Sequence, residues 1–135
     1  MNIELQTENR ILDGFFEFPL PMERVLYEVE QPLIYLTKNK QGQDMLAYFA
    51  YEADDYQFTI VAPVTKKLIS LLESGKIGVR EVLTGSWMWA IRENVALGIF
   101  EAWSITEDAV PVGYLPNPGT LLLPEHRIAL DARAV

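Results

Sequence analysis

The stretch from Pro32 to Leu83 constrains the fold more than any other part of the chain. It contains three β-rich runs, Leu33–Thr37, Met45–Tyr51 and Tyr56–Ala62, and two helical patterns follow them. Runs joined by such short polar segments pair most readily as antiparallel hairpins. We therefore predict an α+β fold built on a mainly antiparallel β-meander.

Turn signals and face patterns support these three strands. Asn39–Gly42 predicts a turn, because asparagine and glycine adopt positive φ at low cost, and Glu52–Asp55 predicts the next turn. The run Met45–Tyr51 is apolar on both faces, which indicates a strand that is covered on both sides. Tyr56–Ala62 alternates apolar and polar residues, so we expect one wetter face there.

A longer and a shorter helix are predicted next. Leucines recur at helical spacing over Lys66–Ser74, with Thr65 as a good N-cap and Gly75 as a natural C-terminal stop. A second apolar stripe predicts a short helix over Val79–Leu83, ended by Gly85. We expect both helices to pack on one face of the sheet.

Further strands are predicted on either side of this stretch. Arg24–Glu30 alternates as a half-buried strand does, and Pro32 suggests a bend or an edge after it. Trp87–Arg92 and Ala96–Ile105 are strand-like, with Glu93-Asn94 as the expected turn between them. We predict one domain over residues 1–135, with its core in residues 24–105.

The two ends of the chain carry weaker patterns. Ile11–Phe18 is rich in phenylalanine, which indicates a short strand or a clamp over the core. Residues 106–135 are rich in proline, and Tyr114–Gly119 must be extended or turning. We expect this C-terminal segment to pack on the body or to fray.

Composition narrows the class of protein. With 135 residues, of which 50% are hydrophobic and 22% charged, the chain can bury a core, and it has no cysteine for disulfides or thiolate sites. The N-terminal segment lacks the pattern of a signal peptide, and the apolar runs are too short to span a bilayer. A net charge of −8 disfavours nucleic-acid binding. We expect a cytoplasmic protein.

Four segments resemble an uncharacterised bacterial family, the domain-of-unknown-function family numbered 6575. They are Tyr27–Tyr35, with its acidic residues before Pro-Leu, Asn39–Gly42 with the apolar strand after it, Leu68–Leu83, and Leu115–Gly119. The chain departs from the family pattern at Gly78, between the two helices. The resemblance implies a fold and a bacterial setting, and it transfers no catalytic residue.

Residues that could carry chemistry are few. His126 is the single histidine and lies in an expected loop without the carboxylate and nucleophile that a catalytic triad needs. The pair Glu28 and Glu30 could do acid–base work only if burial separated the two pKa values. The sequence contains no phosphate-binding glycine motif, and Ser74–Lys76 lies at a helix end.

The acidic residues of the turn after the second predicted strand favour a structural role. Glu52, Asp54 and Asp55 lack the glycine and the later glutamate of a calcium loop, so a charged, soluble turn is the simpler interpretation. We therefore predict no catalytic residue, no metal site and no cofactor.

Aromatic residues gather in the last predicted hairpin. Trp87, Trp89, Phe100 and Trp103 fall within 17 residues. Such side chains fill cores, and they also dominate binding hot spots. The sequence leaves both alternatives open, and these four residues are the candidate partner-binding site.

The favoured function is a non-enzymatic protein-interaction module of a bacterial cytoplasmic system, through a protein partner or self-association. Two alternatives remain: a small-molecule or peptide-binding domain, with an apolar pocket between sheet and helices, and an immunity or antitoxin-like acidic partner of a basic protein. An enzyme acting through Glu28 and Glu30 is the least favoured hypothesis, and membrane or nucleic-acid partners are not expected.

Overall fold

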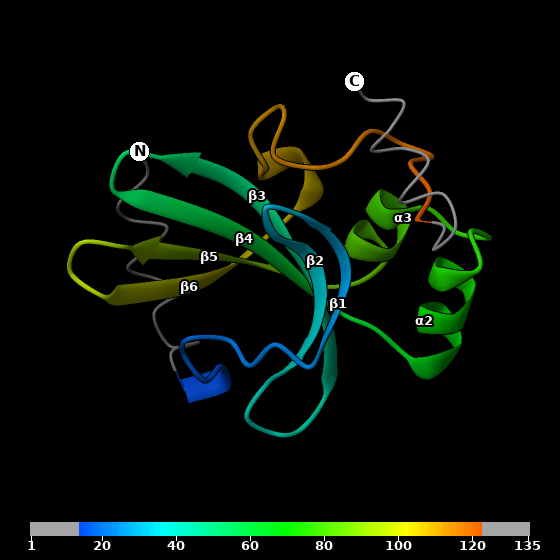
Figure 1. Ribbon diagram of the computed structural model, residues 1–135, viewed down its shortest axis with the longest axis horizontal. Helices are drawn as coiled ribbons and strands as arrows, with labels where there is room; N and C mark the ends of the chain where they lie inside the picture. Colours follow the sequence, from blue (N-terminus) through cyan, green and yellow to red (C-terminus); the bar gives the residue numbers. More distant parts are fainter. Residues whose placement is uncertain (1–13, 123–135) are drawn as a thin grey trace.

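The chain forms a six-stranded antiparallel sheet with two α-helices, in a computed structural model that describes residues 14–122 (Figure 1). The strands are β1 (Arg24–Val29), β2 (Gln31–Lys38), β3 (Asp44–Ala53), β4 (Tyr56–Pro63), β5 (Met88–Asn94) and β6 (Ile99–Ile105). The helices are α2 (Lys66–Glu73) and α3 (Val79–Thr84), and a 3₁₀ turn, η2, spans Glu107–Ala109. Each strand pairs with the next in sequence, which confirms the predicted α+β meander.

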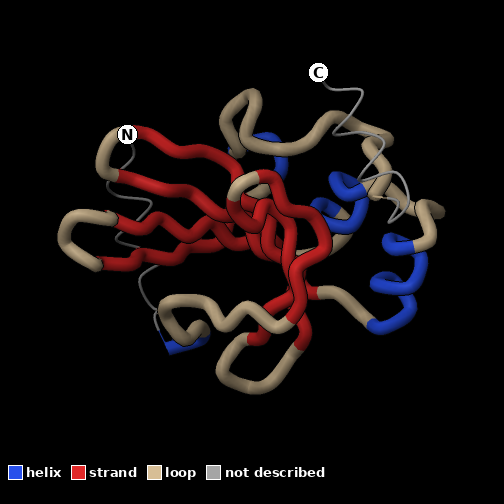
Figure 2. The backbone as a smooth tube through the Cα atoms, in the orientation of Figure 1, coloured by secondary structure: helices blue, strands red, loops and turns tan. Residues whose placement is uncertain are grey.

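Both helices lie in the connection between β4 and β5, beside the sheet in Figure 2. The Thr65 hydroxyl accepts a hydrogen bond from the amide of Leu68 at 3.1 Å, so it caps α2 as predicted. Gly75 follows α2 with a φ of 73°, a conformation that disfavours side chains with a Cβ atom. These local signals set the length of α2.

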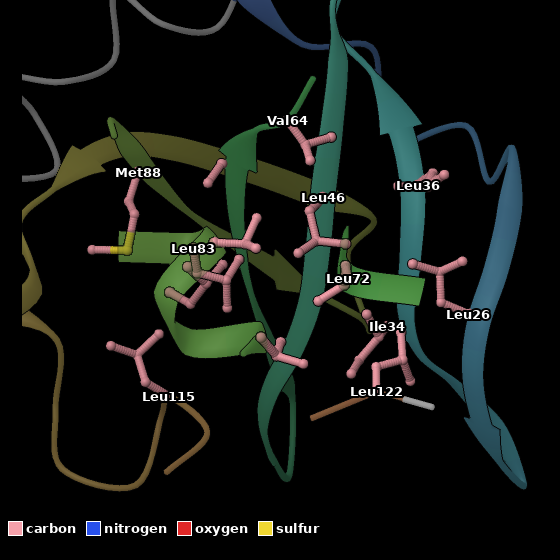
Figure 3. Close-up of a cluster of buried hydrophobic side chains, with 14 of the residues drawn as sticks. Leu26, Ile34, Leu36, Leu46, Val64, Leu72, Leu83, Met88, Leu115 and Leu122 are labelled. Carbon is pink, nitrogen blue, oxygen red and sulfur yellow. The ribbon is translucent and has the colours of Figure 1, made fainter. Parts of the chain in front are cut away.

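A large apolar cluster joins the helices to the sheet (Figure 3). Alternate residues of all six strands meet α2, α3 and the C-terminal segment in it. Its buried members include Leu26, Ile34, Leu36, Leu46, Val64, Leu72, Leu83, Met88, Leu115 and Leu122. At ~25 cal/mol per Å² of apolar surface, this burial is the main favourable contribution to folding.

A second apolar cluster covers the other face of the sheet. Met45 and Ala47 of β3 belong to it, whereas Leu46 between them belongs to the first cluster. Phe16 from the N-terminal segment is 1% exposed and packs in this second cluster, as the clamp alternative predicts. Both faces of β3 are therefore covered, as the apolar run predicts. Residues 11–13 of the predicted clamp lie outside the described residues.

The C-terminal segment returns to the helices. Leu115 and Leu122 are buried in the first cluster. The amide of Val79 donates to the carbonyl of Thr120 at 2.8 Å, and Gly78 forms a β-bridge with Leu121. The described part of the proline-rich segment thus packs on the body, while His126 lies outside the described residues.

Two predicted strand boundaries are wrong. Glu30 is a turn residue with a φ of 65°, so it does not share a strand face with Glu28. The turn between β5 and β6 falls later than Glu93-Asn94, over residues 95–98, and β6 begins at Ile99 rather than Ala96. The cause is local: the Asn94 side chain accepts from the Leu97 amide at 3.1 Å.

Gly78→Ala should destabilise the protein. A Cβ atom there would lie 1.9 Å from Oε1 of Glu81 and 3.2 Å from the carbonyl oxygen of Thr120. The flexible Glu81 side chain can rotate away only by losing its hydrogen bond from the Gly119 amide, and the Thr120 carbonyl must shift. We expect a loss of about 1 kcal/mol, which urea unfolding would measure. Gly14→Ala is the control, because no atom of the described residues lies within 4 Å of the position that its Cβ would take. Equal stability of the two variants would contradict close packing at Gly78.

Candidate functional site

The structure separates the four aromatic residues predicted to bind a partner. Trp103 is 4% exposed and belongs to the first cluster. Trp89 and Phe100 are half-buried in the second cluster, where the Phe100 ring stacks on Phe18 with centroids 4.8 Å apart. Trp87 is 72% exposed. The four side chains do not form one patch, and Trp87 is the member with most of its surface available to a partner.

Trp87 lines a hollow of about 520 Å³, which we call the Trp87 hollow. Its wall is mostly apolar and comes from the end of α3, the start of β5, the end of β6 and η2. Met88 and Ile105 contribute apolar surface, and Thr106 and Glu107 contribute polar groups. A large exposed aromatic beside an apolar hollow is the usual composition of a protein-binding hot spot.

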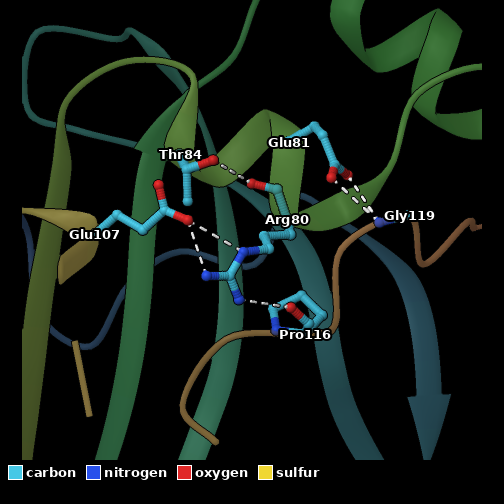
Figure 4. A network of polar contacts seen from close by, with 6 residues as sticks. All are labelled: Arg80, Glu81, Thr84, Glu107, Pro116 and Gly119. Carbon is cyan, nitrogen blue, oxygen red and sulfur yellow. Dashed lines mark hydrogen bonds and ion pairs between the residues drawn. The ribbon is translucent and has the colours of Figure 1, made fainter. Parts of the chain in front are cut away.

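A network around Arg80 holds one wall of this hollow (Figure 4). The Arg80 guanidinium donates to Oε2 of Glu107 at 2.8 Å and 3.2 Å, and to the Pro116 carbonyl at 3.1 Å. Glu81 on the same helix accepts from the Gly119 amide at 3.1 Å. Charge-assisted contacts of this kind fix geometry, so α3 positions both η2 and the proline-rich segment.

The two edges of the sheet differ in how they are protected. β1 carries register irregularities around Tyr27, and Arg24 forms an ion pair at 2.9 Å with Glu73 of α2. β6 pairs with β5 in an unbroken register from Ile99 to Ile105 and contains neither proline nor lysine. Within residues 14–122, no strand pairs with its outer edge. Natural sheets blunt their edges with bulges and charges, so β6 is the less protected of the two sheet edges among the described residues.

A second, smaller hollow of about 160 Å³ lies on the face of the sheet that the second cluster covers. We call it the sheet-face hollow. Its polar lining includes Tyr35, Gln57, Thr59 and Glu93. Burial, together with the nearby charge of Glu93, raises the pKa of Tyr35 to about 12. The neutral Tyr35 hydroxyl can both donate and accept a hydrogen bond.

The acidic residues that the sequence analysis considered for catalysis or metal binding are exposed. Glu28 and Glu30 are both exposed, as are Glu52, Asp54 and Asp55 at the turn between β3 and β4. The described residues contain no group of three acidic or histidine side chains arranged to hold a metal ion. Residues 14–122 also contain no helix with the length and apolar character needed to cross a membrane.

Comparisons with known proteins identify no relative. No family model matches the chain, no curated protein matches it, and no solved structure matches it. The resemblance to family 6575 therefore stays a prediction.

Sequence patterns alone do not single out Arg80, Tyr35 or Glu93. The residue types at Glu93-Asn94 favour a turn. In the structure Glu93 instead belongs to β5, where it lies on the same strand face as Trp89 and Ile91. Arg80 gives no signal, because its partners Glu107 and Pro116 lie 27 and 36 residues further along the chain.

Trp87→Ala should leave the fold intact, whereas Trp103→Ala should weaken it strongly. Removing an exposed ring changes stability by about 0.5 kcal/mol or less, and truncating a buried aromatic costs about 3–5 kcal/mol. Thermal and urea unfolding of the two variants would measure the difference. A comparable loss in both variants would mean that Trp87 is part of the core.

Tyr35 should make stability depend on alkaline pH. Its folded pKa of about 12 lies above the unfolded value near 10, so the neutral form stabilises the fold fully below pH 10. The unfolded chain loses this proton first, and about 2–3 kcal/mol is lost as the pH rises from 10 to 12. Urea unfolding of the wild type and Tyr35→Phe should diverge over that window. Parallel pH profiles would contradict the shift, and Tyr56→Phe, at an exposed tyrosine, is the control.

Proposed function

We propose that the protein is a non-enzymatic protein-interaction module of a bacterial cytoplasmic system, and that its recognition surface is the Trp87 hollow with the outer edge of β6. The observation that carries this proposal is the exposed Trp87 ring on an apolar hollow of about 520 Å³. Tryptophan is enriched in hot spots because it contributes a large, rigid contact area.

The β6 edge extends this surface. Ser104 and Ile105 line the hollow and end the strand, so a segment that pairs with β6 would continue into the hollow. At the other end of β6, Leu97 and Ile99 are 68% and 53% exposed. Strand addition supplies main-chain hydrogen bonds, and flanking pockets supply specificity. The partner we infer therefore presents an extended segment with an apolar side chain at its end.

Charge favours a basic partner. The chain carries a net charge of −8, which attracts a positively charged protein over distances of about a Debye length. Along β6 itself the charge is balanced, because Glu101 forms an ion pair with Arg92. Long-range attraction would speed the encounter, while the apolar hollow would supply most of the affinity. This distribution also suits the immunity or antitoxin-like role, in which an acidic protein binds a basic one.

Photo-crosslinking in living cells tests the proposal. A photo-reactive amino acid replaces Trp87 or Ile99 and, as a control, the exposed Lys67 of α2. We expect discrete protein adducts from the first two positions and none from the third. Binding of the identified partner to the Trp87→Ala variant should be weaker by at least about 30-fold, the effect of a hot-spot residue.

Two results would overturn the proposal. One is the absence of adducts from positions 87 and 99, and the other is an equal yield from position 67. If crosslinking occurs at positions 87 and 99 only, but Trp87→Ala binds the partner with unchanged affinity, the Trp87 hollow is not part of the recognition surface.

A further inference from the structure

The sheet-face hollow contains two polar side chains that the fold leaves without partners. Tyr35 is 8% exposed, and neither its hydroxyl nor the half-buried Glu93 carboxylate makes a hydrogen bond or an ion pair within residues 14–122. The other buried or half-buried acid on this hairpin, Glu101, has Arg92 as its ion-pair partner. Among the described residues the buried polar atom without a partner is the Thr37 hydroxyl, so the Tyr35 hydroxyl and the Glu93 carboxylate keep access to water in the hollow. A ligand that replaces this water can therefore pair with both groups.

The two groups act on the same space. Both line the sheet-face hollow, Tyr35 from β2 and Glu93 from β5. The charge of Glu93 contributes to the raised pKa of Tyr35, so the hydroxyl and the carboxylate lie within electrostatic range of each other. A ligand between them would meet a full negative charge on one side and a neutral hydroxyl on the other.

The remaining walls define the rest of the ligand. Phe49, Ile91 and Phe100 provide apolar and aromatic surface, and Pro19 and Leu20 of the N-terminal segment close one side. Phe100 is held in place by its stack on Phe18. Aromatic walls next to a carboxylate favour an organic cation with a short apolar part. An anion would be repelled by Glu93.

Size limits the ligand further. A volume of about 160 Å³ corresponds to roughly five water molecules at ~30 Å³ each. A bare metal ion would need several oxygen ligands, and the described residues contain no group of three acidic or histidine side chains for one.

We propose that the sheet-face hollow binds a small organic cation, a primary ammonium or guanidinium compound, with the Glu93 carboxylate as its counter-ion and the Tyr35 hydroxyl as a hydrogen-bond acceptor. This site is separate from the Trp87 hollow, with which it shares no lining residue. The charge of Glu93 supplies most of the affinity, because a charge-assisted hydrogen bond is about twice as strong as a neutral one.

Ligand titration followed by NMR tests this proposal. The probes are n-butylammonium and methylguanidinium, with n-butanol and butyrate as neutral and anionic counterparts, all at constant ionic strength. We expect saturable shifts of the amide signals around Tyr35, Gln57 and Glu93 with at least one of the two cations, and none with butyrate. The two cations distinguish an ammonium site from a guanidinium site.

Three variants assign the roles of the residues. Glu93→Gln should weaken binding of the cation by at least about tenfold, and Tyr35→Phe by a few-fold. Glu28→Gln is the matched control: it makes the same change of charge at an exposed position and should bind as the wild type does. The cation should also raise the melting temperature of the wild type and of Glu28→Gln, but not of Glu93→Gln.

The proposal is overturned if butanol binds as well as butylammonium, since the hollow would then recognise only apolar surface. It is also overturned if Glu93→Gln and Glu28→Gln weaken binding equally, because the attraction would then come from the net charge of the chain. The absence of saturable shifts with both cations would likewise reject it.

Discussion

Burial of the sheet on both faces is the constraint on which the rest of the structure depends. An antiparallel sheet can leave one face in water, and in this protein neither face is left so, because β3 and β4 send alternate side chains into two separate clusters. The helices and the proline-rich segment contribute to the first cluster, and the N-terminal phenylalanines contribute to the second. The segments outside the meander are therefore needed to complete the core.

This arrangement limits the surface that is available for function, because covering segments lie over much of both faces. The central strands β3 and β4 are paired along both edges and contribute buried residues to both clusters, and part of one face, at Phe49, Gln57 and Thr59, lines the sheet-face hollow. The Trp87 hollow lies where α3 and η2 end over the first cluster, and the sheet-face hollow lies beside Pro19 and Leu20 at the margin of the second. The two hollows are on independent surfaces, so occupation of one leaves the other accessible.

Local signals explain how much of the fold could be predicted from the sequence, and contacts between distant residues explain the rest. The Thr65 cap, the Gly75 stop and the two-sided apolar run of β3 each depend on a few neighbouring residues, and the structure confirms all three. The position of the turn after β5 depends on the side chain of Asn94 accepting from Leu97, and a turn over Glu93-Asn94 has equally plausible composition. Strand alternation sends Trp103 to one face and Trp89 and Phe100 to the other, a separation set by a register that only the folded sheet defines. Arg80 meets Glu107 across 27 residues, and no local pattern encodes that contact.

Electrostatics distinguishes the two hollows more clearly than their shape does. At the Trp87 hollow, Glu107 is already paired with Arg80, so the wall presents apolar surface and balanced charge to whatever binds. At the sheet-face hollow, Glu93 is half-buried without a cation among the described residues, in a chain whose net charge is already −8. A carboxylate there gains a physical rationale when a cation binds to it, because the ligand then supplies the charge compensation that the fold itself does not.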